Sequence, residues 1–173
     1  MTLTTLIGLL AISAAPKQEP VQVTIETKVC KVVESALALD SEVKIKPLNE
    51  KAANPNVLVL QNFDERKLLK NKGLKVMSSP IIRTLDAMKA EMSVALKGDT
   101  EEIWKSTYTP IVRKDALLDM DIKLSFDHKD DPTKSWNVST KPQLHPGQPI
   151  AYMVQTKGLT MLYIIKAHIG DGS

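Results

Sequence analysis

The stretch GLKVMSSPIIRTLDAMKAEMSVALKGD, residues 73–99, contains two conflicting periodicities. From Thr84 onward it is rich in Ala, Met, Leu, Lys and Glu, which are the strongest helix formers. The apolar residues at 85, 88, 92 and 95 also fall at helical spacing. From Ala90 to Lys97, however, apolar and polar residues alternate, and this period of two is typical of a half-buried strand. The fold class depends on which of the two periods prevails.

The segments on either side favour the strand interpretation. VQVTIETKVCKVV (residues 21–33) and LLDMDIKLSF (residues 117–126) alternate cleanly, and the first is rich in β-branched residues. We therefore expect two antiparallel strands within residues 77–96 that turn near Asp86 and Ala87. Ala87 is an unusual turn residue, because a two-residue hairpin turn prefers Gly or Asn at positive φ.

The rest of the chain predicts further strands and about one short helix. The helix is expected within residues 62–73, with Asn62 as the N-cap and with Leu68 and Leu69 facing the core. Pro80 is expected to interrupt a strand at a sheet edge or a bulge. The predicted class is α+β, mainly β, with antiparallel or mixed strands. The further strands are expected at residues 43–45, 57–60, 74–79, 136–140, 149–155 and 159–169, with loops at 127–135 and 141–148.

A length of 173 residues predicts one domain, expected at residues 21–170. Residues 1–15 contain an apolar run followed by small residues, a pattern that resembles a secretory signal peptide ending at Ser13 or Ala14. A disordered N-terminus, or a first core strand or helix, is the alternative. A linker is expected at residues 16–20 and a tail at 171–173. The apolar run is far shorter than the roughly 20 residues that a membrane-spanning helix needs.

Composition disfavours nucleic acid as a partner. The net charge is only +3, from 23 Lys and Arg against 20 Asp and Glu, and the two signs are interspersed. Lysines form no basic stripe, and few aromatic side chains could stack on bases.

We find no constellation for catalysis, a cofactor or a metal. Cys30 is the only cysteine, with no His close in sequence, so we expect a small, half-buried strand residue. His128, His145 and His168 are too far apart in sequence to form a zinc motif. The acidic residues around 127–131 lack the spacing of a calcium loop. We therefore expect a protein that is not an enzyme and that holds no cofactor.

Several segments, in order, resemble the secretins, the ring-forming channels of bacterial secretion systems and pilus machines. VTIETKVCKV (residues 23–32) is similar to a strand of that family, and MSSPIIRTLDAMKAEMSVA (residues 77–95) is similar to its most specific motif. LDMDIKL (118–124), HPGQPI (145–150) and MLYIIKAHI (161–169) resemble later segments. The matching positions, to which the resemblance gives a structural role, are Glu26, Ser78, Pro80, Thr84, Asp86, Ala90, Val94 and Gly147.

The resemblance also has departures. Lys31 replaces a family Glu, Ala87 and Ala95 replace turn-forming Gly or Asn, and Lys166 stands where the family has a terminal Thr. The charged segment 96–116 is taken as an insertion that is poorly suited to face lipid, since a charge on a lipid face costs up to roughly 2–4 kcal/mol. The chain is therefore expected to be a shortened and divergent secretin-like domain.

The resemblance implies an exported, non-catalytic protein of the periplasm or outer membrane, acting as a structural or interaction module linked to secretion or pilus-type machinery. It would bind protein partners, or other copies of itself, by strand pairing, with residues 21–33 and 159–169 as the candidate surfaces. The alternative for these two segments is that both are central strands. Association with a membrane stays open, without a spanning helix. The alternative is a small periplasmic module that binds a ligand or cation through residues 127–131 and His145.

Overall fold

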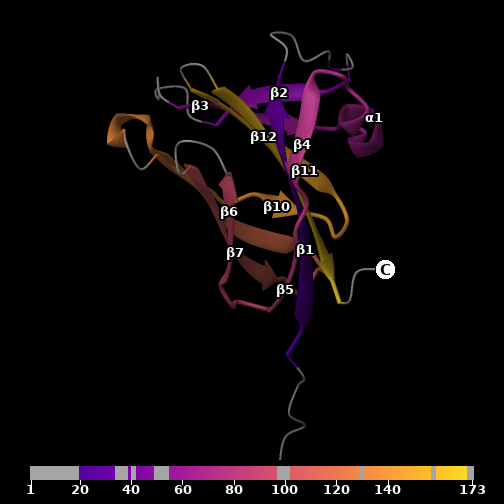
Figure 1. Cartoon of the computed structure of the whole chain (residues 1–173). Helices are drawn as coiled ribbons and strands as arrows, with labels where there is room; N and C mark the ends of the chain where they lie inside the picture. The colour runs from indigo at the N-terminus through magenta and orange to yellow at the C-terminus, as the bar shows by residue number, and fades with distance from the viewer. Residues whose placement is uncertain are drawn as a thin grey trace, which may run out of the picture.

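The structure, a computed structural model, describes residues 20–33, 39, 42–48, 55–96, 102–128, 131–156 and 159–170. The predicted signal peptide, most of the predicted linker and the predicted tail lie outside these residues. The described part is mainly β, with antiparallel pairing in both sheets and one short α-helix, as the sequence predicts. Two sheets pack face to face (Figure 1).

The large sheet contains seven strands in the described part of the chain. They are β1 (Gln22–Val32), β2 (Lys44–Pro47), β3 (Asn56–Gln61), β4 (Leu74–Ser78), β5 (Ile81–Leu85), β11 (Pro149–Thr156) and β12 (Leu159–Ile169). Their order is β2-β3-β11-β12-β1, and then β4 and β5 follow one another along the free side of β1. The two long strands β1 and β12 are therefore central, which contradicts their proposed role as open pairing surfaces.

The small sheet contains five described strands. They are β6 (Ala90–Leu96), β7 (Glu102–Val112), β8 (Leu118–His128), β9 (Trp136–Thr140) and β10 (Gln143–Leu144), with a short 3-10 helix, η1 (Pro132–Lys134), before β9. The segment 96–116, which the resemblance marks as an insertion, includes β7, a central strand of this sheet that the sequence pattern did not predict. Lys105 is exposed on its outer face, while Trp104 and Tyr108 point inward and are buried. The alternation was obscured by polar residues on both faces of β7, including the buried Ser106.

The main core lies between the two sheets and is rich in aromatic side chains. Trp104 is 2% exposed, and its ring centre lies 4.3 Å from that of Phe126 and 5.8 Å from that of Trp136. The hydroxyls of Thr27 on β1 and Tyr108 on β7 share a buried hydrogen bond of 2.9 Å across the sandwich. A buried hydroxyl without a partner would be costly, so this pair also favours one alignment of the two sheets.

A second, smaller cluster covers part of the outer face of the large sheet. It includes Cys30, which is completely buried, so the expectation of a half-buried residue is wrong. The cover comes from Phe63 and from Leu68 of the helix α1 (Glu65–Leu69), which lies on the side of the large sheet away from the small sheet (Figure 1).

The helix N-cap is Asp64 and not Asn62. The Asp64 carboxylate accepts hydrogen bonds from the backbone N–H groups of Arg66 at 2.8 Å and Lys67 at 3.1 Å. Asn62 has a φ of +57°, which ends the preceding strand before the helix begins. Leu68 faces the core as predicted, and Leu69 is partly buried against the second cluster.

The disputed stretch is strand, turn and strand, and not a helix. Asp86 and Ala87 form the turn, and Met92 and Val94 on β6 contact the core while Glu91 and Ser93 are exposed. The expected hairpin is nevertheless wrong, because the two strands do not pair with each other. β5 pairs with β1 in the large sheet, whereas β6 pairs with β7 in the small sheet. The turn is therefore a crossover between the two sheets.

Pro80 lies at a sheet edge, as the sequence predicts. β4 and β5 run along the same side of β1, with Ser79 and Pro80 between them and a register shift at Val29. The Pro80 carbonyl accepts a hydrogen bond from the Thr27 N–H at 3.0 Å, so the chain keeps its pairing through the interruption. Because proline has no N–H, an edge position such as this one is where a strand tolerates it.

The backbone at Ala87 generates a stability prediction. Its φ is +57°, a left-handed conformation that costs an L-residue about 1–2 kcal/mol. Ala87→Gly removes this cost, but glycine also gives the unfolded chain more conformational freedom, which opposes folding. We therefore expect the free energy of unfolding to stay equal or to rise by up to about 1 kcal/mol. The control Ala90→Gly, in β6, should lower it by about 0.5–1 kcal/mol. Urea unfolding of the three proteins measures this, and a loss of stability in Ala87→Gly would contradict the turn.

Candidate functional site

The crossover turn brings together two of the residues that the resemblance singled out, Thr84 and Asp86. The Asp86 side chain accepts a hydrogen bond from the Val112 N–H on β7 at 2.8 Å, while the Asp86 N–H donates to the Val21 carbonyl at 2.8 Å. The Thr84 hydroxyl donates to the Met88 carbonyl at 3.1 Å. One short segment is thus fixed to both sheets, which requires a short side chain with a hydrogen-bond acceptor at position 86.

The other matched positions lie apart from the turn. Ser78 ends β4, Ala90 begins β6, and Val94 packs against the core. Gly147 has a φ of +78°, its N–H donates to the Ala167 carbonyl at 2.7 Å, and a Cβ there would lie 3.4 Å from the His168 ring. The described geometry gives these positions structural contacts and does not gather them into a pocket.

The β5 edge leaves backbone groups open to solvent. Pro80 and Asp86 form hydrogen bonds with β1, and in an antiparallel pair every second residue does so. The backbone groups of Ile82 and Thr84 therefore also form hydrogen bonds with β1. Those of residues 81, 83 and 85 point away from β1. In the described part of the chain no strand pairs with this outer side of β5.

Apolar side chains are exposed along the same edge and around the turn. Ile81 is 65% exposed, Met88 57% and Leu85 40%. Ile111, next to the Pro110 that accepts the Ala87 N–H, is also exposed. Natural proteins usually protect open edges with charges, prolines or covering segments, so exposed apolar residues on such an edge mark an interaction surface.

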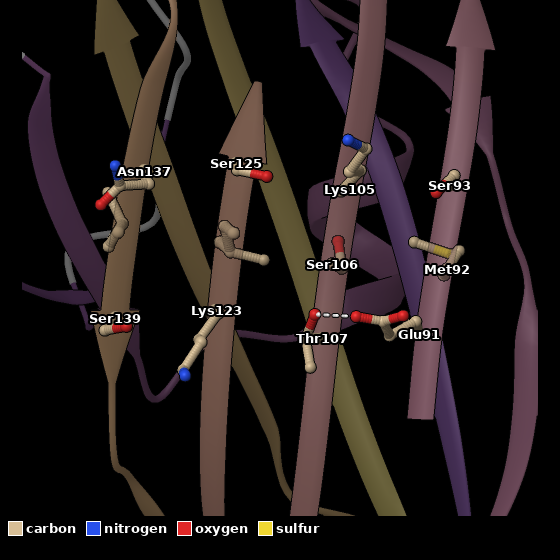
Figure 2. Close-up of a pocket in the computed structure, with 12 residues that line it drawn as sticks. Glu91, Met92, Ser93, Lys105, Ser106, Thr107, Lys123, Ser125, Asn137 and Ser139 are labelled. Atoms are coloured by element: carbon tan, nitrogen blue, oxygen red, sulfur yellow. Dashed lines mark hydrogen bonds between the residues drawn. The ribbon is translucent and has the colours of Figure 1, made fainter. Parts of the chain in front are cut away.

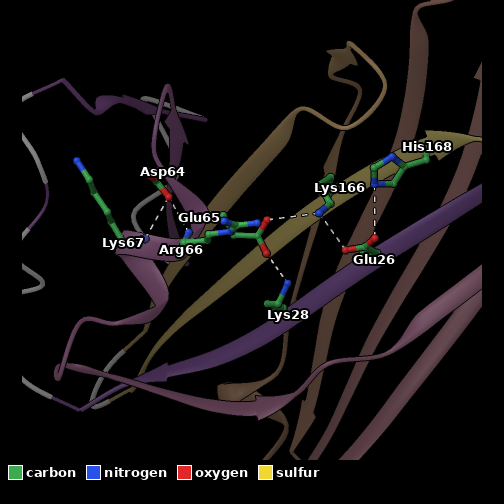
Figure 3. Close-up of polar contacts among 8 residues, drawn as sticks. All are labelled: Glu26, Lys28, Asp64, Glu65, Arg66, Lys67, Lys166 and His168. Carbon is green, nitrogen blue, oxygen red and sulfur yellow. Dashed lines mark hydrogen bonds and ion pairs between the residues drawn. The ribbon is translucent and has the colours of Figure 1, made fainter. Parts of the chain in front are cut away.

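An ion-pair network lies on the outer face of the large sheet, beside the helix (Figure 3). Lys166 on β12 contacts Glu26 on β1 at 3.1 Å and Glu65 on α1 at 3.7 Å. Lys28 pairs with Glu65 from the other side, and the His168 ring lies 3.5 Å from the Glu26 carboxylate. Lys166 is thus a departure from the secretin pattern that contacts Glu26, a position that matches the pattern. Sequence reasoning missed this pair because the register of β1 against β12 was unknown.

The network shifts two pKa values in opposite directions. Burial acts to raise the pKa of Glu26, but the hydrogen bond and charge of Lys166 outweigh it and hold that pKa below its usual value of 4.5. Burial acts to lower the pKa of Lys166, but Glu26 and Glu65 outweigh it and raise that pKa above 10.5. Both partners therefore stay charged at neutral pH, and the network attaches α1 to β1 and β12.

The outer face of the small sheet is polar and hollowed, with a volume of about 630 Å³. Figure 2 shows side chains from four neighbouring strands on this face. Thr107 donates a hydrogen bond to Glu91 at 3.4 Å, and Lys105 pairs with Asp127 at 2.8 Å. The remaining polar lining consists of Ser93, Ser106, Lys123, Ser125, Asn137 and Ser139. The hollow is open, and of its polar residues Ser106 is buried while the others are exposed or half-buried, so its chemistry is mainly that of a solvated sheet face.

The structure does not bring the histidines and the acidic loop together. His128 ends β8 and accepts a hydrogen bond from the Asp131 N–H at 3.1 Å, whereas His145 is exposed beyond the opposite end of that strand. The two parts of the proposed cation site are thus separated by the length of β8. Among the described residues, no group of three or more His, Cys, Asp or Glu side chains could hold a metal ion.

Cys30 offers no reactive thiolate. Burial raises the pKa of its thiol to about 11, and the nearby Lys28 charge opposes this only weakly. Because the thiolate is the nucleophilic form, a buried thiol with a raised pKa is inert. The helices in the described residues also include none long and apolar enough to cross a membrane.

Comparison with known proteins does not assign a family. No protein-family model matches the chain. No curated protein matches it in sequence. Among solved structures, the chain is similar to the InvG secretin domain β-barrel from the Salmonella SPI-1 injectisome NC-base, with 11% identity and a TM-score of 0.33. The match covers 86% of this chain but 61% of that one, so the chain spans less than two thirds of that structure.

The ion-pair network generates a pH-dependent prediction. Because the pKa of Glu26 is lower in the folded state, this group adds stability above pH 4.5 that is lost as the pH falls through its folded pKa. Lys166→Met removes the hydrogen bond and the charge that hold down the pKa of Glu26, so the pKa of this carboxyl rises in the folded state. We therefore expect the unfolding free energy of this variant to be lower at neutral pH and to fall less steeply between roughly pH 5 and pH 3.

Lys89→Met is the matched control, since Lys89 pairs with Glu91 at 2.6 Å but both side chains are mostly exposed. Solvent screens such pairs, so its pH profile should stay close to that of the parent. Urea unfolding at several pH values measures both variants. Identical profiles for the parent and Lys166→Met would show that the network does not stabilise the fold.

Proposed function

We propose that this chain is an exported, non-catalytic protein of the cell envelope, and that it acts as a secretin-like structural or interaction module. Its binding surface would be the edge of the sandwich at β5 and the crossover turn. The observation that carries the proposal is the exposure of Ile81, Leu85 and Met88 on a strand whose outer backbone groups have no described partner.

The mechanism would be addition of a strand to this edge. Main-chain hydrogen bonds from a partner strand would satisfy the open groups of β5, and apolar contacts would cover the exposed side chains. This revises the surfaces expected from sequence, because β1 and β12 already have a neighbour on each side. The partner would be another protein or another copy of the chain, and a link to secretion or pilus-type machinery is part of the proposal.

Export and the absence of turnover complete the proposal. The apolar N-terminal run supports export to the periplasm or the outer membrane, and the buried Cys30 thiol with its raised pKa supports the absence of turnover. The alternative, a module that binds a small polar ligand, is favoured by the hollow on the outer face of the small sheet. His145 lies far from the acidic loop, so a cation site built from both of them is not part of this alternative.

Site-specific photo-cross-linking in cells of the source organism tests the proposal. A photoreactive residue at position 81 should give a protein adduct in the envelope fraction, because Ile81 lies on the proposed surface. The same residue at position 123 is the control, since Lys123 lies on the polar face of the other sheet. The mass of the adduct distinguishes a second copy from another protein. Adducts at 123 but none at 81, or a chain found only in the cytoplasm, would contradict the proposal.

A further inference from the structure

Arg83 is at the centre of the β5 edge. Its backbone groups, like those of Ile81 and Leu85, point away from β1, and all three side chains are exposed. They share one face of the sheet, because side chains alternate along a strand. The open edge therefore presents an apolar, a basic and an apolar side chain, with main-chain donors and acceptors beside them.

The charge of Arg83 has no partner in the described part of the chain. No carboxylate forms an ion pair with it, and the row of the sheet that it shares contains Thr24 on β1 and His168 on β12. Residues 74–85 include Lys75 and Arg83 but no Asp or Glu. The nearest carboxylate along β1, that of Glu26, is already paired with Lys166. The edge is thus electrostatically complementary to an acidic segment.

The same charge opposes pairing between two copies. The two-fold antiparallel register that uses all five residues of β5 would place Arg83 directly opposite Arg83 of the second copy. Like charges directly opposite each other destabilise a strand pair, and charges on open edges commonly prevent self-association in this way. A carboxylate opposite Arg83 reverses the sign of this interaction.

Resting on the proposed function, we propose that β5 binds an extended segment of another protein in which side chains alternate apolar, acidic, apolar. The segment would pair antiparallel, with its carboxylate opposite Arg83 and its apolar residues opposite Ile81 and Leu85. In such pairs the two facing residues exchange N–H and C=O hydrogen bonds, so the three residues facing β5 must have free amide groups.

Titration of the ¹⁵N-labelled protein with synthetic peptides tests this pairing. The probe is Thr-Val-Thr-Glu-Thr-Val-Thr, and the comparison peptide has Lys in place of Glu. We expect the probe to shift the amide signals of Ile81, Arg83 and Leu85. The dissociation constant of the Lys peptide should be higher than that of the probe by a factor of roughly five or more. Arg83→Glu should invert this preference. The control Lys114→Glu makes the same reversal of charge in an exposed turn and should preserve the preference.

N-methylation separates strand pairing from simple charge attraction. Methyl groups on the amides of the Val, Glu and Val residues should abolish binding, while methyl groups on the flanking Thr amides should not. Equal binding of the Glu and Lys peptides, or no binding at millimolar concentration, would overturn the acidic specificity. The cross-linking result at position 81 does not depend on the charge of the partner, so the proposed function could survive that failure.

Discussion

The fold depends on one turn that passes the chain from one sheet to the other. β5 completes the edge of the large sheet, and β6 must then begin the edge of the small sheet. Asp86 makes this possible because its N–H bonds to the strand start at Val21 while its carboxylate accepts the Val112 N–H. A left-handed backbone at Ala87 reverses the chain direction and lets its N–H reach the Pro110 carbonyl.

Pro110 is the residue of the small sheet that lies beside this turn. It lies inside β7, a central strand, where a missing N–H would normally leave a gap in the ladder. β6 pairs with β7 only from Ala90 onward, so at Pro110 the neighbour is the turn and no strand donor is needed. The carbonyl of the same residue is used by Ala87. The proline therefore lies where β6 no longer needs a backbone N–H from β7.

The two faces of the large sheet explain why one edge is left open. The small sheet covers its inner face, and α1 covers part of its outer face. The ion pair between Glu65 on α1 and Lys166 on β12 attaches the helix to the sheet. Beyond this network the same outer face continues to β5, where Ile81, Arg83 and Leu85 are exposed. Among the described residues, a well-packed sandwich is thus combined with an exposed edge that is apolar and basic.

Sequence reasoning predicted the β-rich class, Pro80 at an edge and the turn at Asp86 and Ala87, since these follow from local periodicity and proline chemistry. It could not predict that β5 and β6 belong to different sheets, because a hairpin and a crossover have the same local signals. It missed β7 because Ser106 is a buried polar residue within its alternation. The Glu26–Lys166 pair depends on the register between two strands at opposite ends of the described chain, which no local pattern specifies.

Residue-by-residue amide hydrogen exchange across β5 tests most directly that this strand is an open edge beyond a crossover turn. The Ile82, Thr84 and Asp86 amides bond to β1, so the account predicts slow exchange for these three. The Ile81, Arg83 and Leu85 amides point to solvent in the absence of a partner and should exchange fast. Uniformly slow exchange from residue 81 to residue 88 would contradict the account, because it would indicate a helix or a strand already paired on both sides.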